Sequence, residues 1–170
     1  MKIGIIGQGF VGNAVYQKFK NYFDVLTYDI DESKCNSDFH YIKKGCDTIF
    51  LCLPTPMYED GSCNTSVVEI MLSQINGYGP NKSYDIIIKS TIPPGTTEEW
   101  NNRFKKLNII FNPEFLTEAN AVSDFENQNR IILGGPRPAT TRLKTIFTKV
   151  FPKAHIIKTG SRTAEMVKYV

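Results

Sequence analysis

Several features that mark particular classes of protein are missing from this chain of 170 residues. It has two histidines, and none of its four cysteines (Cys35, Cys46, Cys52 and Cys63) forms a CxxC pair, so the sequence gives no indication of a metal site. The longest apolar runs, such as TIFLCL, are far shorter than the roughly 18 residues of a membrane span. The amino terminus, MKIGIIGQGF, has one lysine and lacks a small-residue cleavage site. It is typical of a first strand rather than a signal peptide, so we expect a cytoplasmic protein with reduced thiols and no membrane partner.

The chain also lacks a block of charge of one sign. Its 20 basic and 17 acidic residues are spread along the sequence and give a formal net charge of +3. Basic and aromatic residues do not alternate in any segment, so nucleic acid is not expected as a partner. With 41% hydrophobic residues, the length is sufficient for one domain with its own core.

Strand-like and helix-like segments alternate along the sequence. A parallel sheet with helices on both faces follows from this order, and the strands are apolar throughout, as expected when both faces are covered. We therefore predict an α/β fold: a single domain with a Rossmann-type, doubly wound and mainly parallel sheet. The expected strands are 2–6, 24–28, 48–53, 85–89, 107–111, 130–133 and 154–158, and the expected helices are 11–20, 65–75, 96–106, 142–150 and 163–170.

Helix starts can be predicted from capping residues. Asn64 is a plausible N-cap for the helix over 65–75, and Thr96 with Glu99 has the spacing of a capping box. The last segment, TAEMVKYV, begins a helix without a stop signal. A helix of two turns is marginal alone, so either it docks tightly or a longer element has been cut.

A glycine-rich turn, Gly7-x-Gly9-x-x-Gly12, directly follows the first strand and opens a helix. In a dinucleotide site the first glycine permits a tight turn, the second lets the backbone approach a pyrophosphate, and the third lets helix and strand pack closely. The free N–H groups of the helix start would face the phosphates. Asp29 follows the second strand, where a carboxylate accepts hydrogen bonds from ribose hydroxyls. No arginine follows it to bind a 2′-phosphate, so NAD is favoured over NADP. A site for S-adenosylmethionine and a turn without ligand are the alternatives.

Polar or rigid residues also follow the third, fourth and fifth strands. They are Pro54 and Thr55, then Ser90 and Thr91, then Glu114 and Glu118. Each set has a plainer explanation: a rigid connector, a turn before a helix cap, and a solvated pair of acids. Because the carboxyl ends of parallel strands meet at one edge, we expect all three loops to converge with the glycine turn. A carboxylate in such a position can act as a general base.

The two glutamates are four residues apart. If their segment is helical, both carboxylates lie on one face, where like charges cost a few tenths of a kcal/mol. On local sequence alone, Lys168 is expected to be a solvated side chain. Cys52 is expected in a strand core and Cys63 in a loop, and neither has an evident electropositive setting that would make it reactive.

The sequence resembles the NAD-binding part of the UDP-glucose/GDP-mannose dehydrogenase family. The matching stretches, in family order, are IGIIGQGFVG, YDIDESK, LPTP, KSTIPPGTT, NPEFLTEANAVSDF, RIILGG and TAEMVKY. They span nearly the whole chain, and KSTIPPGTT with NPEFLTE is the most specific part. The resemblance implies two successive NAD-dependent oxidations of a sugar C6 alcohol to the carboxylate. In this family an active-site cysteine holds the aldehyde as a thiohemiacetal and then as a thioester.

The resemblance also assigns roles to residues. It implies a pyrophosphate site at Gly7, Gln8, Gly9, Phe10, Val11 and Gly12, ribose contact by Asp29, adenosine contact by Lys34, and cofactor lining by Pro54, Thr55, Ser90 and Thr91. Thr91 also counts among the catalytic residues. Glu114 would act as, or position, the base for thioester hydrolysis, and Glu118 would bridge cofactor and water. Phe115, Leu116 and Thr117 would contact the nucleotide-sugar through backbone, and Lys168 would stabilise the developing oxyanion.

Some parts of the family pattern are missing from these 170 residues. The GGxCxPKD-like stretch with the nucleophile is absent, as are the central dimerisation helix and the domain that closes over UDP. The segment between Lys34 and Asp47 is shorter than in the family. We expect residues 1–160 to form the NAD-binding domain and residues 161–170 to start a helix toward the dimerisation domain. A partner chain or a missing half would carry the cysteine. The alternatives are a non-catalytic NAD-binding module, or a degenerate paralogue, and a compact dehydrogenase with another substrate.

Overall fold

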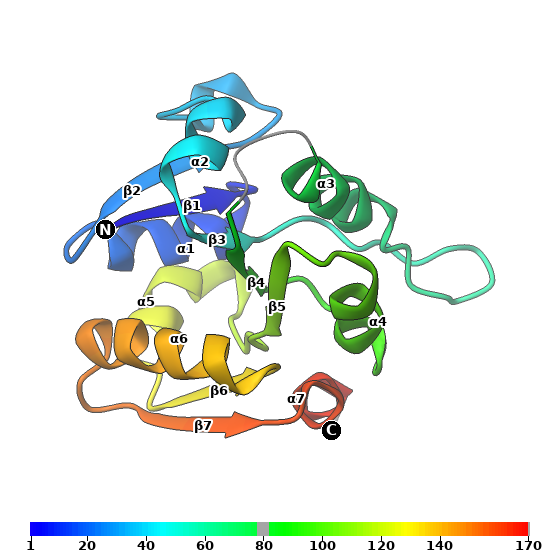
Figure 1. The fold of residues 1–170 in the computed structure, drawn as a ribbon. Coiled ribbons are helices and arrows are strands. Elements are labelled where there is room, and N and C mark those ends of the chain that lie inside the picture. The colour runs from blue at the N-terminus through cyan, green and yellow to red at the C-terminus, as the bar shows by residue number, and fades with distance from the viewer. Residues whose placement is uncertain (78–81, 170) are drawn as a thin grey trace.

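A computed structural model describes residues 1–77 and 82–169, and its centre is a single seven-stranded sheet (Figure 1). The strand order is β2-β1-β3-β4-β5-β6-β7, and all neighbours are parallel except β5 and β6. The Rossmann-type, mainly parallel sheet predicted from the sequence is confirmed. The strands are β1 (Lys2–Ile6), β2 (Asp24–Tyr28), β3 (Thr48–Leu51), β4 (Tyr84–Ile88), β5 (Leu107–Phe111), β6 (Arg130–Gly134) and β7 (His155–Thr159).

Helices cover both faces of this sheet. One apolar cluster contains side chains of α1, α5 and α6, and the other contains side chains of α2, α3, α4 and α7. None of the helices in the described part of the chain is long and apolar enough to cross a membrane. The helices are α1 (Phe10–Phe19), α2 (Phe39–Gly45), α3 (Ser66–Asn76), α4 (Thr96–Arg103), α5 (Ala121–Glu126), α6 (Arg137–Val150) and α7 (Ser161–Met166), with 3₁₀ turns η1 (Glu32–Lys34), η2 (Glu118–Asn120) and η3 (Val167–Tyr169).

The apolar strands explain why the sheet needs helices on both sides. In β4, Ile87 packs into the first cluster while Ile86 and Ile88 pack into the second. Successive side chains of a strand point to opposite faces, so an uninterrupted apolar strand buries both only between two layers. All three isoleucines are fully buried.

The sheet changes direction between β5 and β6. The two strands are antiparallel and share one paired position, Phe111 with Gly134. Where they diverge, the side chain of Asn101 on α4 pairs with the backbone of Ile109, donating to its carbonyl and accepting from its N–H at 2.8 Å each. An asparagine side chain thus replaces a missing strand partner, since buried backbone groups must be hydrogen-bonded.

Two helices were not expected from the sequence. α2 lies in the short segment after Lys34, and its one buried residue, Ile42, packs beside Gly4 of β1. α5 follows the NPEFLTE segment and buries Ala121 and Phe125. Both have only six or seven residues, too few for a helical pattern to stand out in the sequence.

Several predicted boundaries were also wrong. α6 begins at Arg137, five residues before the predicted start, because Pro138 is tolerated in the first turn. α4 ends at Arg103 rather than at residue 106, and β3 ends at Leu51. Thr65, rather than Asn64, is the N-cap of α3, although Asn64 Oδ1 still accepts from Ser66 N at 3.0 Å. The predicted last helix is a shorter α7 followed by η3, and Val170 lies outside the described residues.

The predicted capping box of α4 does not form. The N-cap is Gly95, with φ of +97°, and no side chain of this helix start caps it. Instead, the carboxylate of Glu165 from α7 accepts from Gly95 N at 2.5 Å and from Thr97 N at 2.8 Å. Glu165 is fully buried, so its charge is compensated by free N–H groups and the positive end of α4.

Replacing Glu165 therefore tests which carboxylate caps α4. Glu165→Ala leaves two buried N–H groups without acceptors, and we expect it to lower the free energy of unfolding by about 2–4 kcal/mol. Glu99→Ala, at the exposed position of the predicted capping box, should cost about 0.5 kcal/mol or less. Urea unfolding followed by circular dichroism measures both. Equal losses for the two variants would contradict the role of Glu165.

Candidate functional site

A cavity of about 720 Å³ lies at the carboxyl edge of the sheet. Its wall includes residues that follow five neighbouring strands in sheet order: β2, β1, β3, β4 and β5. The predicted convergence of the glycine turn with the three strand-end loops is thereby confirmed. The predicted site residues on its lining are Gly7, Gly9, Phe10, Val11, Asp29, Lys34, Pro54, Thr55, Ser90, Thr91 and Glu114.

The glycine turn has the geometry of a cradle. Gly7 has φ of +93°, and a Cβ there would lie 2.3 Å from the backbone oxygen of Cys52. A Cβ on Gly12 would lie 1.8 Å from the backbone oxygen of Gly7, so α1 packs directly on the turn. A Cβ on Gly9 meets nothing within 4 Å. Two glycines are required by the fold itself, and the third leaves open space where a phosphate can approach the backbone.

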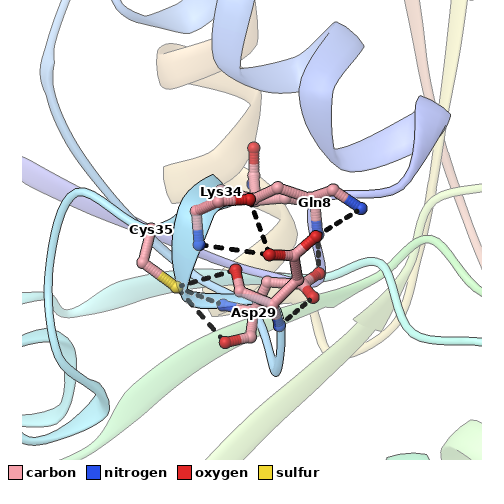
Figure 2. Close-up of polar contacts among 6 residues, drawn as sticks. Gln8, Asp29, Lys34 and Cys35 are labelled. Carbon is pink, nitrogen blue, oxygen red and sulfur yellow. Dashed lines mark hydrogen bonds and ion pairs between the residues drawn. The ribbon is translucent and has the colours of Figure 1, made fainter.

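Asp29 lies on the lining of the cavity, and Figure 2 shows its polar contacts with Gln8 and Cys35. Its carboxylate accepts from Gln8 N at 2.6 Å and from Asp31 N at 2.9 Å. Its backbone is held by Cys35, whose sulfur accepts from Asp29 N at 3.1 Å and lies 3.2 Å from Asp29 O. The acid is thus fixed beside the glycine turn, which is the arrangement that ribose binding requires.

Lys34 stands on η1 at the same end. Its ammonium lies 3.3 Å from the carboxylate of Asp31, and it lines both this cavity and an adjoining one of about 590 Å³. Half of its side chain remains exposed. A cation here can contact the adenosine side of a bound dinucleotide, as the resemblance implies.

The loops after β3 and β4 are joined by hydroxyl groups. Ser90 Oγ donates to Leu53 O at 2.6 Å and accepts from Leu53 N at 3.0 Å. Thr55 Oγ1 donates to Thr91 O at 2.7 Å. Ser90 and Thr55 therefore shape the wall of the cavity, and Pro54 and Thr91 stand on it.

Glu114, on the lining of the cavity, forms an ion pair with Lys168, which is not itself one of the lining residues. Lys168 Nζ lies 2.7 Å from Glu114 Oε1 and 2.6 Å from Glu114 O, and the second carboxylate oxygen accepts from Leu116 N at 2.8 Å. Only 12% of the Glu114 side chain and 22% of the Lys168 side chain are exposed. The expectation that Lys168 is a solvated surface side chain was therefore wrong. The lysine lies 54 residues from its partner in sequence, so only the fold brings them together.

Glu118 is not part of this arrangement. The backbone from Glu114 to Thr117 is not helical, so the two glutamates do not share a helix face. Glu118 opens η2, is exposed and does not line the cavity. Thr117 is fixed by Asp124, which accepts from both its N–H and its hydroxyl. Phe115 is 51% exposed, with the ammonium of Lys168 5.7 Å from its ring centre, and Leu116 is partly buried.

The cavity also contains a lysine that was not singled out in the sequence. Lys89 follows β4 directly, is 3% exposed and donates from Nζ to Asn112 Oδ1 at 2.9 Å. Asn112 is itself buried and donates to Ile132 O at 2.8 Å. Burial lowers the pKa of Lys89 to about 8. Its position could have identified it from the sequence, because Lys89 is a charged residue directly after an apolar strand and directly before Ser90 and Thr91.

Two of the cysteines, Cys46 and Cys52, are not activated. All four are free thiols, and burial raises the pKa of Cys52 to about 12 and of Cys46 to about 11. Such thiols are poor nucleophiles. In the described part of the chain, no group of three or more metal-ligating side chains is placed to hold an ion.

Comparisons with known proteins identify the family of this chain. A sequence model of the "UDP-glucose/GDP-mannose dehydrogenase family, NAD binding domain" matches residues 35–153. The chain is 30% identical to UDP-glucose 6-dehydrogenase of Haloferax volcanii, with 99% of this chain and 50% of that protein covered. It is 29% identical to UDP-N-acetyl-D-mannosamine dehydrogenase of Methanococcus maripaludis, covering 98% and 46%.

The solved structure of a UDP-glucose dehydrogenase from Pyrobaculum islandicum has the same fold. Its TM-score is 0.86 at 24% identity, with 99% of this chain and 48% of that chain covered. The chain thus spans about half the length of the relatives named here. The resemblance and the preference for NAD inferred from the sequence are both confirmed. The chain belongs to the UDP-glucose/GDP-mannose dehydrogenase family and is its NAD-binding domain.

Proposed function

We propose that this chain is the cofactor-binding part of a UDP-glucose 6-dehydrogenase-like enzyme, which oxidises the C6 alcohol of a nucleotide-sugar toward the carboxylate. The observation that carries the proposal is Glu114, which lines the same cavity as the glycine turn and forms an ion pair with Lys168 directly behind it. A binding module would need only the turn and Asp29. A carboxylate and an ammonium in contact at the opposite end are groups that chemistry on a carbonyl carbon uses.

The cofactor end is proposed to work through backbone and one carboxylate. N–H groups of the turn from Gly7 to Gly12 and the start of α1 bind the pyrophosphate, and Asp29 accepts from the ribose. Lys34 contacts the adenosine side. Pro54, Thr55, Ser90 and Thr91 line the path from the turn to Glu114.

The reacting end is proposed to use the ion pair. NAD bound in this cradle would supply the hydride acceptor for each of the two oxidations, with one NAD consumed per oxidation. Lys168 stabilises negative charge on the sugar oxygen, since its ammonium is held at the cavity by Glu114. Glu114 serves, or positions, the base in hydrolysis, and the backbone of Phe115 to Thr117 contacts the nucleotide-sugar. Glu118 is proposed to bridge cofactor and water, which requires a movement of η2, because it is exposed and outside the cavity here.

The nucleophile is proposed to come from outside these residues. The GGxCxPKD-like stretch is absent from these residues, and burial raises the pKa of the Cys46 and Cys52 thiols, so the thioester is proposed to need a cysteine from a longer form of this protein or from a partner chain. We place the end of the NAD-binding domain at residue 160, with 161–170 leading toward a dimerisation domain. The same inactive thiols favour one alternative, a non-catalytic NAD-binding module.

Gly9 provides a test of cofactor binding that leaves the fold intact. Because a Cβ at this position meets nothing and its φ is −68°, Gly9→Ala should change the free energy of unfolding by about 1 kcal/mol or less. The added methyl group occupies the approach of the pyrophosphate, so we expect the affinity for NAD to fall by about tenfold or more. Isothermal titration calorimetry with NAD measures this.

Gly12→Ala is the matched variant, because its Cβ would collide with backbone and should destabilise the chain itself. Unchanged NAD affinity in Gly9→Ala would show that the turn does not hold the pyrophosphate.

Catalysis is tested by supplying the missing nucleophile. The chain alone should bind NAD without forming NADH from UDP-glucose. Co-expression with the cysteine-bearing half of a family member should restore NADH formation, and Lys168→Met in this chain should reduce it by about a hundredfold or more. NADH is followed by its absorbance. Binding of NAD without any turnover in every combination would favour the non-catalytic module.

A further inference from the structure

Lys89 is a buried cation that the proposed chemistry does not use. It lies at the floor of the cavity, 3% exposed, between the ends of β3 and β5. Among residues 1–77 and 82–169, its ammonium has one hydrogen-bond acceptor, Asn112 Oδ1 at 2.9 Å, and it lies 5.6 Å from the centre of the Phe125 ring. Within the described residues, no acidic side chain forms an ion pair with it.

The charged and titratable groups that face Lys89 come from three other elements. Cys52 follows β3, Glu114 follows β5 and Lys168 belongs to η3. Of these, the Glu114 carboxylate is already in contact with Lys168. The negative charge of Glu114 is therefore shared with a second ammonium. An unpaired buried ammonium is held in its charged form only weakly, because burial disfavours the charge.

The position of Lys89 along the cavity relates it to one part of the cofactor. Asp29 follows β2, the glycine turn follows β1, and Lys89 follows β4, two strands further across the sheet. If the adenosine ribose binds Asp29 and the pyrophosphate binds the turn, the nicotinamide lies on the side of Lys89. This step rests on the proposed function.

We propose that Lys89 is a positioning residue that distinguishes the two redox states of the cofactor: its ammonium opposes the positively charged nicotinamide ring of NAD⁺ and accepts the neutral ring of NADH. Binding of NAD⁺ then displaces a proton from the Lys89 ammonium to the buffer and leaves a neutral amine. Binding of NADH leaves the ammonium protonated. No covalent bond other than N–H changes, and no electron is transferred in this step.

A comparison of NAD⁺ binding with NADH binding isolates the effect of the ring charge. NAD⁺ and NADH carry the same pyrophosphate, so its attraction for Lys89 contributes equally to both. The ring charge is what differs, and like charges in a poorly solvated site can change an affinity by about tenfold. Burial already lowers the pKa of Lys89 to about 8, so a further lowering by the positive nicotinamide ring releases the proton near neutral pH.

Calorimetry of the whole chain tests the proposal. Titrations with NAD⁺ and with NADH near pH 7.5, in buffers of different ionisation enthalpy, give the protons exchanged in each case. The wild-type chain should release more protons with NAD⁺ than with NADH. Between about pH 7 and pH 9.5, its Kd for NAD⁺ should fall by about tenfold relative to its Kd for NADH.

Lys89→Met should abolish the extra proton release with NAD⁺ and the pH dependence of its relative affinity. It should also lower the Kd for NAD⁺ divided by the Kd for NADH by about tenfold near pH 7. Lys89→Arg keeps the charge but does not titrate in this range, so the ratio should stay high at every pH. Lys144→Met, at an exposed position on α6, removes a distant charge and should behave as wild type. A Lys89→Met chain with the wild-type ratio and proton exchange would overturn the proposal, as would wild-type titrations that show no difference between the two nucleotides.

The failure of the proposed function looks different. If neither nucleotide binds the wild-type chain, the dinucleotide site itself is wrong, and the role of Lys89 falls with it. If both bind with identical proton exchange, the site stands and only the role of Lys89 is refuted.

Unfolding without any ligand provides the second readout. Because the pKa of Lys89 is about 8 in the folded chain and its ordinary value is 10.5, the unfolded chain binds more protons between these values. The free energy of unfolding of the wild type minus that of Lys89→Met should therefore increase as the pH rises above about 8. Cys46 and Cys52 also titrate differently in the folded and unfolded chain, because burial raises their pKa values to about 11 and about 12 from the ordinary 9.0. Both variants contain these cysteines, so their contribution cancels in the stability difference. A stability difference that does not change between about pH 7 and pH 9 would overturn the proposal.

Discussion

The bond between Glu165 and the start of α4 is the contact on which the reacting end of the cavity depends. Its buried carboxylate accepts from Gly95 and Thr97, which places α7 against the loop that carries Thr91. The neighbouring Tyr169 hydroxyl donates to Ile92 O at 3.1 Å, and Lys168 reaches Glu114. One short carboxy-terminal segment thus ties the loops after β4 and β5 together. Since α7 has only six residues, these polar contacts and the burial of Ala164 hold it in place.

The cofactor end depends on a different constraint, the close packing of backbone. Gly7 and Gly12 are required because any side chain would collide with main-chain atoms, whereas Gly9 leaves free space. Asp29 is positioned by hydrogen bonds from Gln8 and Asp31 (Figure 2). A backbone cradle can be specified by few residues close in sequence, while the ion pair at the other end needs segments 54 residues apart.

Charge is distributed unevenly between these ends. The end of the cavity near the glycine turn presents the carboxylate of Asp29, with Lys34 already paired to Asp31. The reacting end holds two ammonium groups, Lys89 and Lys168, around the single carboxylate of Glu114. Such an excess of positive charge suits a site where an oxyanion develops, which is the role proposed for this end of the cavity.

Much of this could be predicted from local sequence. The apolar strands, their order with the helices, the glycine turn and Asp29 are short-range patterns, because strand burial and turn geometry are decided by adjacent residues. The helices α2 and α5 were not predicted, because a segment of six or seven residues shows no clear helical periodicity of apolar residues. The capping of α4 was assigned to Glu99, which has the right spacing, and only the packing of α7 put Glu165 there instead. Tertiary structure likewise decided that Lys168 is buried against Glu114, that Glu118 is outside, and that Lys89 lies unpaired in the floor of the cavity. The interaction energy and pKa of a charged side chain depend on its distance to other charges and on its burial. Separation along the sequence determines neither of these.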